Sequence, residues 1–164
     1  MKYSIAAIAA LLVFVGGVSF AQPKDSAVPC QDLNQQIVSL AGEYKELRER
    51  RKRLPQGTLD RDISGDGGRL SKVLSALGTE LGHPPYTKKI VTNCLGEPDA
   101  IRSHEKMRNF LEIYNRELRK AGREVEDKRE REYLIYFWRG WHDFLFFIVE
   151  EGVIVDHGWW FAYE

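Results

Sequence analysis

The sequence predicts an α+β domain in which N-terminal helices pack on a C-terminal three-stranded antiparallel meander. Apolar residues recur with the helical period up to about residue 121, whereas from Tyr133 onward they form short blocks separated by turn residues. Most of the chain's aromatic residues, including all four tryptophans, also lie after residue 132. We expect one domain over residues 32–164, preceded by a flexible mature N-terminus at residues 22–31.

The first residues have the pattern of a secretory signal peptide. Lys2 precedes an apolar run from Ile5 to Val18, and the small residues Ser19 and Ala21 suit positions −3 and −1 of a cleavage site. We therefore expect residues 1–21 to be removed and the protein to be secreted or periplasmic, with no stable membrane span after cleavage. An uncleaved membrane anchor is the alternative, although the apolar run is short for crossing a bilayer.

Two cysteines, Cys30 and Cys94, fall in the expected mature chain. An extracytoplasmic compartment permits a disulfide between them, and two buried free thiols are the alternative, because only geometry decides pairing. Val28 and Pro29 before Cys30 do not form a lipobox, so a lipid anchor is not expected. The four histidines are scattered without the ligand spacing of a zinc site, and no cofactor is predicted.

The charges of the chain are balanced. It has 24 Lys and Arg against 24 Asp and Glu, and its formal net charge is zero. A general nucleic-acid-binding protein carries a basic excess, so this class is excluded.

The helical part is predicted to contain four helices. In the first, Asp32 and Gln35 have the spacing of a capping box. Pro55 ends that helix, and Gly96 ends the third. The predicted ranges are about 33–53, 69–81, 87–95 and 103–121.

A Gly- and Asp-rich loop is expected at residues 56–68. Within it, the spacing of Asp60, Asp62, Ser64 and Asp66 resembles the first half of an EF-hand calcium loop, which needs oxygen ligands at alternate positions. Position twelve is Ser71 instead of the bidentate glutamate, so a turn that caps the next helix is the alternative reading.

The C-terminal part is predicted to contain three strands, at residues 133–138, at 144–149, and at 153–155 continuing through 159–163 with a kink at Gly158. Gly152 is expected to take a positive φ in a bulged turn. Because strand side chains alternate, both faces of the sheet are apolar. The helices can cover one face. The other needs residues 103–121, a partner protein, a second copy or a ligand.

The turn from Trp138 to Asp143 contains the candidate catalytic residues. Asp143 would orient His142 as an acid–base pair, and Arg139 would bind an anionic group, as in a hydrolase. No Ser or Cys nucleophile lies in the last 60 residues, so we assign no catalytic residue. The alternative is that the three side chains bond to backbone groups at the end of the sheet while the tryptophan rings seal the core. A further possibility is a glycan or small-ligand site with stacking platforms at Trp138, Trp141, Trp159 and Trp160.

Residues 86–164 resemble the small exported modules of the SmpA/OmlA outer-membrane assembly family and of the β-lactamase-inhibitor-like fold. The resemblance is carried by Val91, Leu95-Gly96-Glu97-Pro98, Trp138 and the hairpin at residues 146–155. The chain departs from these modules in lacking a lipobox and in having a charged helical insert after Pro98. The resemblance implies binding or assembly rather than catalysis, through an unknown protein partner or self-association.

Overall fold

The computed structural model describes residues 28–55, 58, 60–120, 122 and 130–162. The expected signal peptide at residues 1–21, and the expected flexible segment up to residue 27, lie outside the described residues. The elements in chain order are a 3₁₀ turn (Cys30–Asp32), α1 (Gln35–Arg53), α2 (Arg61–Ser64), α3 (Arg69–Leu81), α4 (Lys88–Leu95), β1 (Ala100–Ser103), α5 (His104–Lys120), β2 (Glu132–Phe137), β3 (Asp143–Glu150) and β4 (Val153–Phe161).

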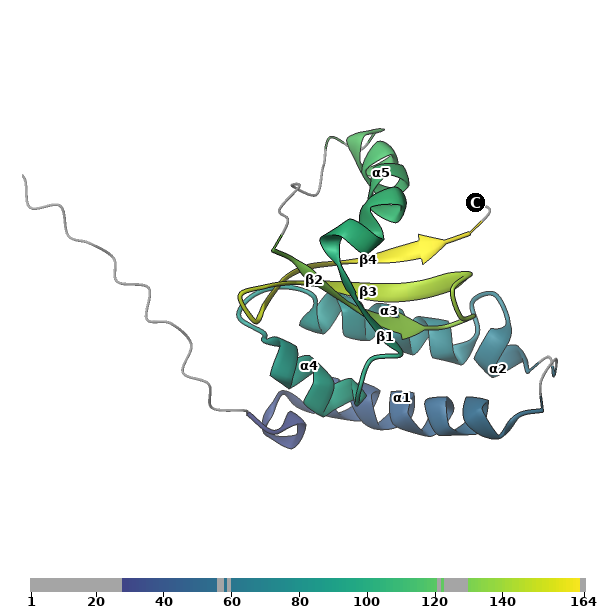
Figure 1. Ribbon diagram of the computed structural model, residues 1–164. Helices are drawn as coiled ribbons and strands as arrows, with labels where there is room; N and C mark the ends of the chain where they lie inside the picture. The colour runs from purple at the N-terminus through teal and green to yellow at the C-terminus, as the bar shows by residue number, and fades with distance from the viewer. Residues whose placement is uncertain (1–27, 56–57, 59, 121, 123–129, 163–164) are drawn as a thin grey trace, which may run out of the picture.

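The α+β class is confirmed, but the sheet has four strands instead of three. Its order is β1-β2-β3-β4 and every neighbouring pair is antiparallel. The additional strand, β1, pairs Ala100 with Ile135 and Ser103 with Glu132. Because β1 comes before α5, one helix is inserted within the sheet's sequence. Figure 1 shows α1, α3 and α4 on one side of the sheet and α5 on the other.

The first helix begins later than the predicted capping box. Asn34 is the N-cap, and its side chain accepts a hydrogen bond from the amide of Ile37 at 2.9 Å. The expected cap, Asp32, ends the 3₁₀ turn instead, so that prediction is wrong. The helix still places its apolar stripe inward, and Ile37 and Tyr44 are buried.

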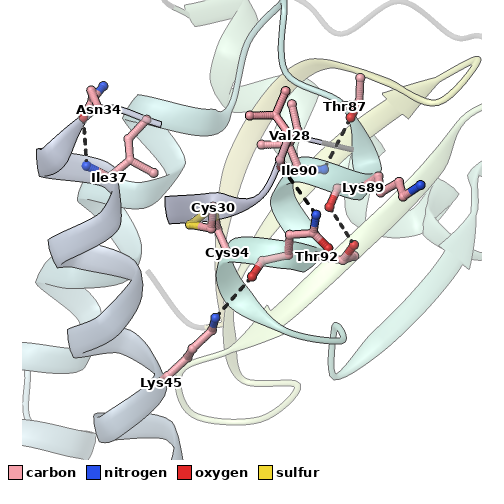
Figure 2. Close-up of a disulfide and its surroundings, with 11 residues drawn as sticks. Val28, Cys30, Asn34, Ile37, Lys45, Thr87, Lys89, Ile90, Thr92 and Cys94 are labelled. Carbon is pink, nitrogen blue, oxygen red and sulfur yellow. Dashed lines mark hydrogen bonds between the residues drawn. A yellow bond between two sulfur atoms is a disulfide. The ribbon is translucent and has the colours of Figure 1, made fainter. Parts of the chain in front are cut away.

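The first described residues are fastened to α4 by a disulfide between Cys30 and Cys94, whose Cα atoms are 5.0 Å apart (Figure 2). The alternative of two free thiols is therefore excluded. Nearby, Asn93 Nδ2 donates to the carbonyl of Val28 at 3.5 Å, and Lys45 Nζ donates to the carbonyl of Asn93 at 3.1 Å. These contacts join the start of the described chain, α1 and α4 into one unit.

The predicted helices at 69–81 and 87–95 are confirmed as α3 and α4. Thr87 caps α4 through a hydrogen bond from the amide of Ile90, and Gly96, with φ of 77°, ends it. The predicted 56–68 loop differs, because it contains the short helix α2 with Asp60 as its N-cap.

The C-terminal hairpin is tighter than predicted. Glu150 pairs with Val153, so Glu151 and Gly152 form a two-residue turn, with φ of 50° and 80°. The irregularity lies within the strands instead: the register shifts between Ile148 and Val149. The kink expected at Gly158 does not interrupt the last strand, because β4 is continuous through this residue.

The two apolar faces of the sheet form two separate cores, as the alternation predicts. Leu134, Tyr136, Leu145 and Phe147 lie in a core with α1, α3 and α4. The opposite face contributes Tyr133, Ile135, Phe144, Phe146 and Ile148 to a second core, which α5 covers with Met107, Phe110, Leu111, Tyr114 and Leu118. Neither face as a whole therefore needs a partner to cover it.

Glycines allow helices to approach β4 from both sides. A Cβ atom on Gly82 would overlap the imidazole of His157, and one on Gly78 would lie 2.9 Å from the same ring. On the other face, a Cβ on Gly158 would overlap the hydroxyl of Tyr114. Gly78 in α3 and Gly82 just after it thus leave a notch at the C-terminal end of the helix that receives His157.

Candidate functional site

The turn between β2 and β3 brings the predicted catalytic residues together at one end of the sheet. Gly140 has a φ of 67°, which permits the reversal. The amides of Trp138 and Arg139 both donate to the carbonyl of Asp143 at 3.0 Å. Asp143 is thereby placed at the closing position of the turn.

The carboxylate of Asp143 is the centre of this turn. It is 1 % exposed, it accepts a hydrogen bond from Arg139 Nε, and its Oδ2 lies 3.0 Å from His142 Nδ1. The guanidinium of Arg139 lies 4.0 Å from the ring centre of Trp138, and its Nη1 pairs with Asp66 at 3.0 Å. The three predicted residues do converge, and Asp143 holds Arg139 and His142 within the turn.

The four tryptophans do not form a row of platforms. Trp138 is 5 % exposed, and its Nε1 donates to the carbonyl of Ile63 at 2.8 Å. Trp159 and Trp160 are half-buried neighbours on β4, and they pack in different cores. Trp141, in the turn, is the most open of the four at 44 %.

Trp141 belongs to a cluster of rings on the α5 side of the sheet. Its ring centre is 4.8 Å from that of Phe137 and 5.8 Å from that of the buried Phe144. Trp160 continues the cluster by stacking on Phe144 and contacting Phe110 edge-on at 4.8 Å. We call Phe110, Phe137, Trp141, Phe144 and Trp160 the aromatic end.

A cation lies on the open ring of the aromatic end. The guanidinium carbon of Arg102, from β1, is 4.8 Å from the ring centre of Trp141. Trp141 thus contacts two phenylalanine rings and an arginine, while much of its surface is exposed to solvent.

The residues of the predicted calcium loop have other partners. Asp60 accepts from the amides of Asp62 and Ile63 as the cap of α2, and it pairs with Arg50 at 2.6 Å. Ser64 Oγ donates to the carbonyl of Asp60 at 3.0 Å. Asp66 pairs with Arg139, as described above. In the part of the chain that the structure describes, no group of three or more His, Cys, Asp or Glu side chains is placed to hold a metal ion.

One polar network was not predicted as such. Asp99 Oδ1 pairs with Arg48 at 3.0 Å and Arg51 at 3.3 Å, and its Oδ2 accepts from the amide of Phe137 at 2.8 Å. The amide of Asp99 donates to the carbonyl of Ile135 at 2.8 Å. Arg51 also donates to the carbonyl of Phe137. The only sequence signal was two arginines three residues apart on the helix face that carries Tyr44.

Two tyrosines lie beside this Asp99 network. The rings of Tyr44 and Tyr136 meet edge-on with centres 6.2 Å apart, and the hydroxyl of Tyr136 donates to the carbonyl of Gly96 at 3.0 Å. Burial raises the pKa of both phenols above the ordinary tyrosine value. Both phenols therefore stay protonated at a more alkaline pH than an exposed tyrosine does.

The cavities found on the surface are open and lined by mixed charges. One of about 600 Å³ lies beside α1 and the start of α3 and includes Glu43, Arg61 and Lys72. Another, of about 380 Å³, lies between Lys89 on α4 and Gly152 in the last hairpin. None of these lining residues forms a set with the acid, base and nucleophile of a hydrolase.

Comparison of the chain with protein-family models, with curated proteins and with solved structures finds no match in any of the three. Among the helices that the structure describes, each is too short or too polar to span a bilayer.

Proposed function

We propose that this chain is an exported, non-catalytic protein-binding module that contacts its partner through the aromatic end. The observation that carries the proposal is Trp141, which is 44 % exposed although phenylalanine rings and Arg102 hold it in place. Tryptophan and arginine are the residue types enriched at the energetic centres of protein interfaces. A pre-positioned ring also loses little conformational entropy when it binds.

Export is the second part of the proposal. It is supported by the signal-peptide pattern of residues 1–21 together with the Cys30–Cys94 disulfide, since disulfides persist in oxidising compartments. The resemblance to outer-membrane assembly modules implies the same class of function and remains a prediction.

The bonds of the turn favour binding over hydrolysis. A general base needs a carboxylate or imidazole that can accept a proton from substrate or water. Here the carboxylate of Asp143 is buried and contacts both Arg139 and His142. Such contacts are expected of a side chain that closes a turn. We assign these three residues to the support of Trp138 and Trp141 rather than to a reaction.

The test is the affinity of the Trp141→Ala variant for a partner identified by chemical cross-linking in the extracytoplasmic fraction. Ile113→Ala is the matched control, because Ile113 is 42 % exposed on α5 outside the aromatic end. We expect the Trp141 variant to bind about 30-fold more weakly by calorimetry, as for an interface hot spot. Ile113→Ala should bind like the wild type. Equal affinities of the two variants would contradict the proposal.

A further inference from the structure

Strand β4 forms one edge of the sheet (Figure 1). The backbone of its first half is protected. Val153 pairs with Thr87 in an isolated bridge, and the amide of Ile154 donates to the carbonyl of Tyr86 at 2.8 Å. The register shift follows, because Val149 pairs with Ile154 while Ile148 pairs with Asp156. Such bulges and bridges are the usual protection of a sheet edge against pairing with another chain.

The hydrogen-bond pattern identifies which residues of β4 face outward. The carbonyl of Asp143 accepts a hydrogen bond from the amide of Trp138, which directly follows β2, so the backbone groups of Asp143 point toward β2. Because backbone groups alternate in direction along a strand, those of every second residue of β3, beginning with Phe144, point toward β4. Phe144 pairs with Trp160, and Phe146 pairs with Gly158. The intervening residues of β4, which are His157, Trp159 and Phe161, therefore direct their amides and carbonyls away from the sheet.

The outward side of the second half lacks that protection. The amide of His157 is the exception, because it donates a hydrogen bond to Asp156 Oδ1 at 2.8 Å. In the described part of the chain, no strand other than β3 pairs with Trp159 or Phe161. The stretch from Gly158 to Ala162 contains no charged residue and no proline, which are the residues that normally blunt an edge. Phe161 is also 37 % exposed.

We propose that this edge pairs with the same edge of a second copy of the chain, antiparallel and with the two-fold axis at Trp159. The amide and carbonyl of Trp159 then bond to those of Trp159 in the second copy. The amide of Phe161 bonds to the carbonyl of His157 in the second copy, and the reverse pair follows by symmetry. In this register the amide of His157 faces the carbonyl of Phe161 in the second copy, so it exchanges its bond to Asp156 Oδ1 for that carbonyl.

The edge fits a second copy because its outward groups satisfy one another in this register. Side-chain pairing agrees with it: Trp160 lies opposite Gly158, which has no side chain, and His157 lies opposite Phe161. No like charges meet across the pair. The result is a continuous eight-stranded sheet across the dimer. The inference goes beyond the proposed function, because it concerns the β4 edge rather than Trp141 and a second copy rather than another protein.

The first test is the dimerisation of the mature protein by analytical ultracentrifugation. Phe161→Lys places a charge on the edge, and Trp141→Lys is the matched control at the aromatic end. We expect the wild type and Trp141→Lys to form a concentration-dependent dimer. The dimer dissociation constant of Phe161→Lys should be higher than that of the wild type by about tenfold or more. Near-ultraviolet circular dichroism checks that each variant is folded.

The second test uses the wild type alone, so it does not depend on any variant folding. We expect amide hydrogen exchange at Trp159 and Phe161 to slow as protein concentration rises, while exchange at other edge amides does not change. A wild type that is monomeric up to about 1 mM, equal dimerisation of the two lysine variants, or exchange independent of concentration would each overturn the inference. Partner binding lost in Trp141→Ala, with the wild type monomeric, would leave the proposed function standing.

Discussion

The two sides of the sheet are covered in different ways. On one side, the Cys30–Cys94 disulfide links the turn before α1 to α4, and the Asp99 network links α1 to the sheet. Strand β4 also fits against two glycines at the C-terminal end of α3. On the other side a single helix, α5, covers the second core by apolar and aromatic packing and by a buried hydrogen bond between His104 and Tyr133 at 2.9 Å. The comparison teaches that equal apolarity of the two faces in the sequence does not mean equal reinforcement in the structure.

The difference also explains where aromatic surface remains open. Three helices cover the first face, and Trp138 is buried there against Ile63. On the second face α5 reaches Trp160 through Phe110, but Trp141 lies farther along the turn and stays exposed. The candidate binding surface is therefore a consequence of covering one face with one helix.

The largest effect is expected from removing the disulfide. Cys30 and Cys94 are 64 residues apart, and a cross-link of this length stabilises by about 4 kcal/mol in the chain-entropy model. The double variant with both cysteines replaced by serine should lose about that much free energy of unfolding in urea. Reduction of the wild type should lower the free energy of unfolding by the same amount. A loss below about 1 kcal/mol would contradict the stabilising role given to the disulfide.

A matched pair of leucines compares the two cores directly. Leu77 on α3 and Leu111 on α5 are both buried. Truncation of a buried leucine to alanine costs about 3 to 4 kcal/mol where the surroundings cannot relax, and about 2 kcal/mol where they can. We expect Leu77→Ala to lose more stability than Leu111→Ala in urea unfolding, because a single helix can shift to close the cavity. An equal or reversed order would mean that α5 is held as firmly as α3.

The Asp99 network is tested by replacing one carboxylate. Asp99→Asn leaves Arg48 and Arg51 partly buried without their countercharge, and we expect a loss of about 2 kcal/mol in urea unfolding. Asp62→Asn is the control, since its pair with Arg50 is about half exposed on both sides. That change should cost less than about 1 kcal/mol. Similar losses for both variants would show that the network does not reinforce this side.

Alkaline pH should weaken the same side. Burial raises the pKa of Tyr44 and Tyr136, so above about pH 10 the unfolded chain releases protons that the folded chain retains. The contribution of these phenols to the free energy of unfolding is therefore fully present below about pH 10. Above that pH the free energy of unfolding falls, by at most about 1.4 kcal/mol per pH unit for each phenol. Tyr136→Phe should reduce the slope of unfolding free energy against pH. An unchanged slope would mean that this phenol ionises in the folded state.

The sequence was informative where a local period decides structure. It predicted α3 and α4, the helical part at residues 103–121, the strands β2 and β3, and the assignment of alternate residues to the two faces. It missed β1 because four residues, Ala-Ile-Arg-Ser, on a sheet edge carry almost no pattern of their own. It misplaced the cap of α1 because Asn34 and Asp32 are both good caps, and the disulfide-linked turn uses Asp32.

Long-range polar partners were beyond sequence reasoning. Asp99 and Arg51 are 48 residues apart, and nothing local in the sequence indicates that they meet. The convergence of Arg139, His142 and Asp143 followed from their closeness in the sequence, whereas the contact of Arg139 with Asp66 did not. The exposure of Trp141 and the burial of Trp138 depend on α2 and α5, so only the three-dimensional arrangement distinguishes these two rings.

Hydroxyl-radical footprinting of the mature protein, read residue by residue by mass spectrometry, tests most directly whether both sheet faces are covered within the chain and open aromatic surface remains at the turn. The account predicts fast oxidation of Trp141, and slow oxidation of Trp138 and Phe147 until the protein unfolds. Oxidation of Trp138 or Phe147 as fast as Trp141 in the folded protein would contradict it.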